Sequence, residues 1–252
     1  MGCTKALDFA APPGAHLSFY WTMDEGGVSP KLDSTVGLAW PLIFSAQAAP
    51  GLFSNGLRMA NSVLLNQIPG LGLFGTTAIT INQAVSKGLS AWFWVKPTAY
   101  VFVFELTLDT DDVMHTNRFR VGGHIDNAGS GVLEVNHTND TNDVFTDTPN
   151  LSWALGTWHM VTMTYNKVAQ TLNIYIDGAL SSSIADPFVY PDLTISDWFL
   201  TAGPSLGGAV IGASDECGLC LNGALTPAQV TALWNGGLGV TWPGVTAIVP
   251  FP

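Results

Sequence analysis

The sequence predicts an all-β protein, a sandwich or barrel of strands joined by tight turns, with one short helix near the C-terminus. Almost every apolar run is short and bounded by Gly, Pro, Asn or Asp, a pattern typical of strands joined by turns. Thr171–Ile176 alternates between apolar and other side chains, and the Asp177-Gly178 step that follows favours a tight hairpin turn. Many strands at short intervals favour a sandwich or barrel over alternating strands and helices.

Taken in chain order, the apolar runs predict the individual strands. Within the run from 89 to 97, Trp92 and Trp94 are two residues apart and share one face of the strand, while Phe93 faces the other side. These aromatic residues are expected in the core. The strands are expected near Leu17–Met23, Gly56–Leu65, Ala78–Asn82, Leu89–Pro97, Val101–Leu108, Asn117–Ile125, Gly131–His137, Trp158–Tyr165, Thr171–Ile176, Ala179–Ile184, Trp198–Thr201, Ala209–Gly212 and Glu216–Leu221.

The helix is predicted from a capping-box pattern at Thr226–Gln229 with Pro at its first position. Val230, Leu233 and Trp234 form its apolar stripe, and Gly236 favours its end. A helix of about ten residues is too short to be stable alone, so it must pack on a sheet. We expect an extended arm over 1–16, one domain over 17–237 and an apolar tail over 238–252.

Charge is scarce in this chain. Eight Lys and Arg residues stand against 19 Asp and Glu, for a net charge of −11, and no basic cluster is present. Nucleic acids and anionic membranes are therefore poor partners, because both need cations to neutralise phosphates. Only 11% of residues are charged, against about 25% in an average domain. Either part of the surface is covered by partner chains, as in a homo-oligomer, or Ser, Thr and Asn cover it; both interpretations stay open.

The N-terminus contains no signal-peptide core, because Asp8 interrupts its first apolar stretch and Pro12 follows. No run resembles a membrane-spanning segment. An exposed module without a secretion signal suits a particle released by lysis, so we expect an extracellular or virion-surface location. Cys217 and Cys220 lie three apart in a predicted strand, where their side chains face opposite sides, so we expect two buried thiols rather than a disulfide or metal site.

Six motifs, two of which are pairs of segments, carry a family resemblance. In order they are Leu17–Gly26, Asp33–Gly37, Gly51–Met59, Leu89–Pro97, the pair Gly156–Tyr165 and Leu172–Gly178, and the pair Gly212–Leu221 and Ala224–Gly236. Through them the chain resembles the laminin-G-like branch of the concanavalin A-like lectin/glucanase superfamily, over about residues 17–237. The resemblance implies a jelly-roll of two packed antiparallel sheets.

The resemblance also implies a Ca²⁺ site built from Asp33 and Asp215, with backbone carbonyls near Gly37. Carboxylate and carbonyl oxygens are the ligands that Ca²⁺ prefers. The loop that begins at Asp33 lacks the family's Gly-Asn pairs, which removes amide ligands. The alternative is that Asp33 caps a turn and Asp215 accepts hydrogen bonds from backbone amides.

Four tryptophans lie beside Pro, Gly, Asp or Ser and are candidates for exposed surfaces that stack on sugars or partners: Trp40, Trp153, Trp198 and Trp242. In the apolar tail, the candidate interface residues are Val240, Trp242, Val249 and Phe251. These assignments predict contact with surface glycans, with other subunits, or with both.

No catalytic residues are predicted. The glucanases of the superfamily carry a Glu-x-Asp-x-Glu or related strand, which is absent here. Glu105 and Asp109 are four residues apart, about 13 Å along a strand, whereas glycosidases hold their carboxyl pair about 5–9.5 Å apart. Glu105 and Glu134 could meet only through tertiary contacts. The expected function is a non-enzymatic adhesion subunit or decoration of an extracellular assembly, such as a phage or viral particle or fibre; the alternative is a soluble Ca²⁺-dependent lectin.

Overall fold

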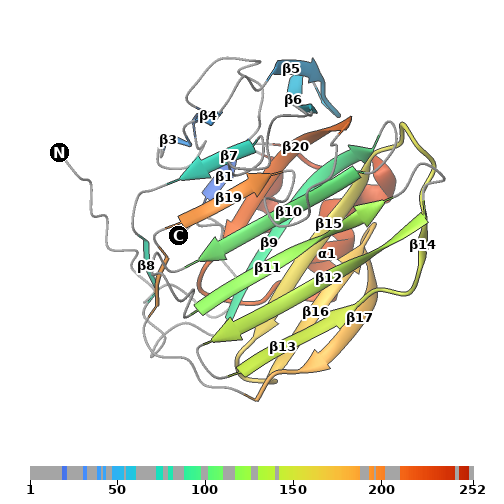
Figure 1. Ribbon diagram of the computed structural model, residues 1–252. Helices are drawn as coiled ribbons and strands as arrows, with labels where there is room; N and C mark the ends of the chain where they lie inside the picture. Colours follow the sequence, from blue (N-terminus) through green and yellow to red (C-terminus); the bar gives the residue numbers. More distant parts are fainter. Residues whose placement is uncertain are drawn as a thin grey trace.

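A computed structural model confirms the two-sheet antiparallel sandwich (Figure 1). The structure describes residues 19–21, 31–32, 39–40, 42–43, 47–53, 55–60, 72–75, 79–81, 88–97, 102–109, 117–125, 130–139, 142–187, 193–195, 197–201, 211–241 and 244–249. Every strand pair in both sheets is antiparallel, so tight hairpins can join neighbours directly.

The first sheet has the order β17-β16-β15-β9-β20-β6-β5, with β1 also paired to β20. Its strands are β1 Phe19–Trp21, β5 Gln47–Pro50, β6 Asn55–Ala60, β9 Gly88–Pro97, β15 His159–Asn166, β16 Thr171–Ile176, β17 Ala179–Ala185 and β20 Ile211–Cys220. The predicted hairpin between β16 and β17 is confirmed, because Asp177 and Gly178 both have positive φ, 53° and 79°.

The second sheet has the order β13-β12-β11-β10-β19-β7-β4, with β14 also paired to β12. Its strands are β4 Leu42–Ile43, β7 Gly72–Gly75, β10 Phe102–Asp109, β11 Asn117–Ile125, β12 Ser130–Asn139, β13 Asn142–Asp147, β14 Leu151–Ser152 and β19 Asp197–Thr201. Two small ribbons pair β2 Lys31–Leu32 with β3 Ala39–Trp40, and β8 Ile79–Ile81 with β18 Leu193–Ile195. The polar stretch 137–150 contains the end of β12 and the whole of β13, which pair as a hairpin.

Alternating residues fill the space between the sheets. From the second sheet, Leu133, Val135 and His137 are fully buried, and His137 meets Tyr165 of β15 edge-on with ring centroids 5.2 Å apart. Asp186, directly after β17, accepts a hydrogen bond from His137 Nδ1 at 2.6 Å. A buried polar pair therefore links the two layers of the sandwich.

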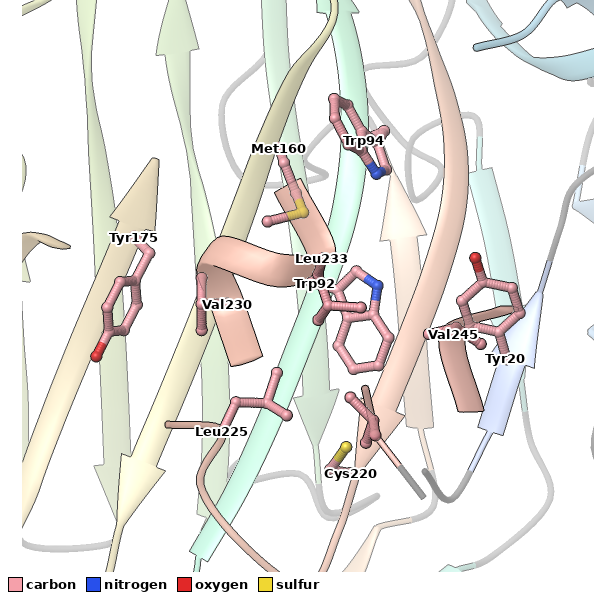
Figure 2. Close-up of a cluster of buried hydrophobic side chains, with 11 residues drawn as sticks. Tyr20, Trp92, Trp94, Met160, Tyr175, Cys220, Leu225, Val230, Leu233 and Val245 are labelled. Carbon is pink, nitrogen blue, oxygen red and sulfur yellow. The ribbon is translucent and has the colours of Figure 1, made fainter. Parts of the chain in front are cut away.

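The outer face of the first sheet is covered by α1 (Pro227–Trp234) and by the C-terminal segment (Figures 1 and 2). Val230 and Leu233 of α1 are buried in one cluster with Trp92 and Trp94, and Trp234 stacks on Trp94 with centroids 5.1 Å apart. The prediction that this helix packs on a sheet is therefore confirmed. The capping box is also confirmed, because Thr226 accepts the Gln229 backbone N–H and the Gln229 side chain accepts the Thr226 N–H.

The C-terminal segment packs on its own chain. Short 3₁₀ turns, η1 Asn235–Gly237 and η2 Gly244–Ala247, fold it back over the first sheet. Val245 and Val249 are fully buried in the same cluster as Trp92 and Trp94. The interface assignment of Val249 is therefore wrong, because its side chain is fully buried, whereas Leu238 of the same tail is 72% exposed.

The two cysteines of β20 lie on opposite faces, as expected. Cys217 is in register with Phe93 on the inner face, whereas Cys220 belongs to the cluster under α1 (Figure 2). Both are free thiols buried in the fold. Among the described residues, no helix has the length and hydrophobicity needed to cross a bilayer.

Candidate functional site

The outer face of the second sheet is the side of the sandwich that no described helix covers, because α1 lies behind the first sheet (Figure 1). Along β12, Leu133, Val135 and His137 point inward, so the residues between them face outward. We call the outward residues at this edge the open-face strip. It comprises Val132, Glu134 and Asn136 of β12 and Phe145 and Asp147 of β13.

The strip combines an exposed aromatic ring with polar groups. Phe145 is 49% exposed and stands directly opposite Asn136, which is only 7% exposed. Glu134 stands directly opposite the exposed Asp147. Side chains of such cross-strand pairs start about 4.5–5.5 Å apart. A mostly buried amide, two carboxylates that are at least partly exposed and a half-exposed apolar ring thus lie side by side on this face. These are group types that bind hydroxylated molecules.

Strand register also brings together two carboxylate positions that are far apart in sequence. Glu105 of β10 is in register with Gly122 of β11, and Gly122 is in register with Glu134 of β12. Strands lie about 4.8 Å apart, so the two glutamate backbones are about 10 Å apart. The tertiary fold therefore does place Glu105 and Glu134 in one row. These two carboxylate positions are therefore the candidates for a hydrolytic pair on this face.

A second polar cluster surrounds a β-bulge in β20, at Asp215 and Glu216. Glu216 has a positive φ of 42°, which is unusual for a residue with a side chain. Its Oε1 accepts a hydrogen bond from Thr241 Oγ1 at 3.0 Å. The Tyr20 hydroxyl donates to the Val240 carbonyl at 3.1 Å. Burial, and then the neighbouring Glu216 carboxylate, raise the pKa of Tyr20 well above its usual value.

Asp215 does not by itself make a calcium site. Its Oδ2 accepts the Leu52 backbone N–H at 2.7 Å and its Oδ1 accepts the Glu216 N–H at 3.0 Å. Ca²⁺ takes six to eight oxygen ligands, and in the described part of the chain no three His, Cys, Asp or Glu side chains are grouped to hold a metal. The described donors fit the alternative of an aspartate that binds backbone amides. Asp33 and Gly37 lie outside the described residues.

Trp153 is not the exposed stacking surface that the sequence predicts. It is only 6% exposed, and its indole stacks on the His159 ring with centroids 4.2 Å apart. His159 Nδ1 bonds Asp177 Oδ2 at 2.8 Å, and Asp177 Oδ1 accepts the Met160 N–H at 3.0 Å. Trp153 is buried because it covers the His159 imidazole, which is hydrogen-bonded to Asp177 in the β16–β17 turn.

The other predicted contact residues are placed only in part. Trp40 ends β3 and Trp198 lies in β19, but their side chains are not among those described. Trp242 and Phe251 lie outside the described residues. Val240 is partly buried against the core cluster. Sequence reasoning missed the open-face strip, because its members become neighbours only through the β12–β13 register.

The fold and the residue pattern agree with a protein-family comparison. Residues 74–231, more than half of the chain, match the Laminin_G_3 model of the concanavalin A-like lectin/glucanases superfamily. The chain belongs to this superfamily. Comparison of this superfamily member with curated protein sequences gave no match.

Solved structures of similar fold are mostly binding domains. The botulinum neurotoxin serotype D binding domain aligns with a TM-score of 0.60 at 11% identity, over 88% of this chain and 52% of that one. Another structure of the serotype D ligand-binding domain, in complex with N-acetylneuraminic acid, gives 0.58 at 10% identity, over 88% and 51%. This superfamily member spans about half the length of those toxin domains.

Domain 4 of AbnA, an extracellular arabinanase from Geobacillus stearothermophilus, was solved with arabinotriose. It aligns with a TM-score of 0.56 at 19% identity, over 87% of this chain and 98% of that one. At such identities the alignments establish the shared fold.

Proposed function

We propose that this protein is a non-catalytic adhesion module that binds carbohydrate through the open-face strip. The observation that carries the proposal is the half-exposed ring of Phe145, flanked by the Asn136 amide and two carboxylates on a sheet face that no described helix covers. A pyranose presents an apolar C–H face that packs on an aromatic ring and hydroxyls that bond amides and carboxylates. Structures of similar fold that were solved with arabinotriose or N-acetylneuraminic acid support a sugar as the ligand class.

The test compares Phe145→Ala with Leu180→Ala on a glycan array. Leu180 is 56% exposed on β17 of the other sheet, so its truncation matches the loss of exposed apolar surface away from the strip. We expect Phe145→Ala to bind at least tenfold more weakly, about 1.4 kcal/mol, and Leu180→Ala to bind as the parent does. Equal binding by parent and Phe145→Ala, with unchanged melting temperatures, would refute the site.

Catalysis is tested on the same ligands. Incubating the protein with each bound oligosaccharide and measuring new reducing ends should give no turnover above buffer. Turnover that Glu134→Gln abolishes would instead establish hydrolysis, with the row through Glu105 and Glu134 as its carboxyl pair.

We propose that Ca²⁺, if it binds, acts at Asp33 and Asp215 rather than in the strip. Binding that needs Ca²⁺ and is lost in Asp215→Asn would support the alternative of a Ca²⁺-dependent lectin. Equal glycan binding in the presence of Ca²⁺ and of a chelator would show that the binding does not depend on Ca²⁺.

We further propose that the module works as a subunit or decoration of an extracellular assembly, such as a phage or viral particle or fibre. Its 11% charged residues support this, as do the exposed Val168 and Leu238. Size-exclusion chromatography with light scattering is the test. We expect a defined oligomer, and a monomer at high concentration would count against the assembly.

A further inference from the structure

We infer that the open-face strip selects uncharged carbohydrate and rejects anionic carbohydrate. This inference rests on the proposed function and adds the ligand class. Its starting point is that Glu134 and Asp147, which lie directly opposite one another, are at least partly open to solvent beside Phe145. A sugar stacked on Phe145 therefore places its substituents next to two carboxylates.

The charge pattern extends across four strands. Three consecutive register rows cross β10, β11, β12 and β13 on this face, through Asp109–Arg118–Thr138–Asp143, Thr107–Arg120–Asn136–Phe145 and Glu105–Gly122–Glu134–Asp147. Residues that share a row, or lie two apart on a strand, lie on the same face of the sheet. The three rows hold five acidic positions and two arginine positions, so the residues placed there carry a net charge of −3.

The two carboxylates of the strip act differently on neutral and anionic sugars. A carboxylate accepts hydrogen bonds from sugar hydroxyls, and such bonds to an ionised acceptor are stronger than those between neutral groups. A carboxylate or sulfate on the sugar would instead meet like charge at close range. The net charge of −11 adds a repulsive field that slows the approach of anions.

Gly122 places a gap in the acidic row. It stands in register between Glu105 and Glu134, and it contributes no side chain to the sheet surface. A hydroxyl group that extends from a sugar on Phe145 toward Gly122 would therefore lie between two acidic positions of the row, and an anionic substituent there would meet like charge.

The experiment uses paired glycans that differ only in charge. Suitable probes are N-acetyllactosamine oligomers with their sialylated and sulfated forms, and xylo-oligosaccharides with their glucuronic acid-substituted forms. For the pair that binds, we expect the neutral member to bind at least tenfold more tightly at low salt. The ratio of the neutral to the anionic affinity should fall at about 0.5 M NaCl, because salt screens electrostatic repulsion at an exposed face.

A double variant and a matched control locate the source of the selectivity. The double variant Glu134→Gln/Asp147→Asn should bind the anionic member more tightly. The ratio of the neutral to the anionic affinity should therefore fall at least threefold. Ala228→Lys with Ala232→Lys changes the net charge by the same amount at exposed positions of α1, on the far side of the sandwich. This control should leave the ratio unchanged.

The possible results distinguish a failure of the charge selectivity from a failure of the proposed carbohydrate binding. If glycans bind but the anionic members bind equally well or better, the selectivity is refuted and the carbohydrate function stands. An equal change in the ratio for the α1 control would also refute it, because the effect would then come from net charge. If neither member of any pair binds, the carbohydrate function itself fails, and the inference fails with it.

Discussion

The buried pair of His137 and Asp186 makes the sandwich sensitive to acid. Both side chains are fully buried between the sheets, with Nδ1 of His137 donating to Asp186 Oδ2 at 2.6 Å and Tyr165 packed against the imidazole ring. Burial lowers the pKa of His137 from 6.5 to about 4, and the Asp186 carboxylate opposes this only in part. The folded state therefore resists protonation of His137 more than the unfolded chain does.

The sign and size of the effect follow from this difference. Above about pH 6.5 the imidazole is neutral in both states and contributes no pH dependence. Between about pH 6.5 and pH 4 the unfolded chain binds a proton that the folded protein does not, so stability is lost as the pH falls. Each pH unit is worth about 1.4 kcal/mol, so the full loss is about 3 kcal/mol.

The assay is urea unfolding of the parent protein and of His137→Gln at pH 7 and pH 4. Glutamine keeps an N–H donor for Asp186 but does not titrate. We expect the parent to lose about 3 kcal/mol more than the variant between the two pH values. If the parent and His137→Gln lose the same free energy, the buried imidazole is not the acid-sensitive group.

Three further predictions concern the packing on the two faces of the first sheet. Val249→Ala should cost about 2 kcal/mol of unfolding free energy in urea melts, because it opens a cavity in the cluster under α1; the exposed Leu238→Ala should cost almost nothing. Thr226→Ala removes the helix cap and should cost about 1 kcal/mol, and an unchanged urea midpoint would contradict that role. Burial raises the pKa of the Cys217 and Cys220 thiols. A Cys3→Ser variant should therefore react with a thiol reagent only after unfolding. Rapid reaction of the folded variant would disprove the burial of these two thiols.

Local signals account for the parts of the fold that were predictable from the sequence. The Asp177-Gly178 turn and the Thr226 cap each depend on a few adjacent residues whose backbone preferences are strong. The alternation of Trp92, Phe93 and Trp94 follows from the period of a strand. These features therefore appear in the structure where the sequence placed them.

Packing over long sequence separations was not predictable in the same way. The segment that contains Val245 and Val249 looks like a free apolar tail, because nothing local indicates that it folds back over Trp92. Trp153 looks exposed from its polar neighbours, yet it stacks on His159 six residues later. The open-face strip likewise exists only once β12 and β13 are paired in register.

The most direct test of the central claim is a glycan array probed with the parent protein and with Phe145→Ala, with and without Ca²⁺. The account predicts specific binding by the parent, at least tenfold weaker binding by the variant, and stronger signals from neutral than from anionic members of each pair. A blank array for the parent in both conditions would contradict the carbohydrate function and leave protein–protein assembly as the role of this module.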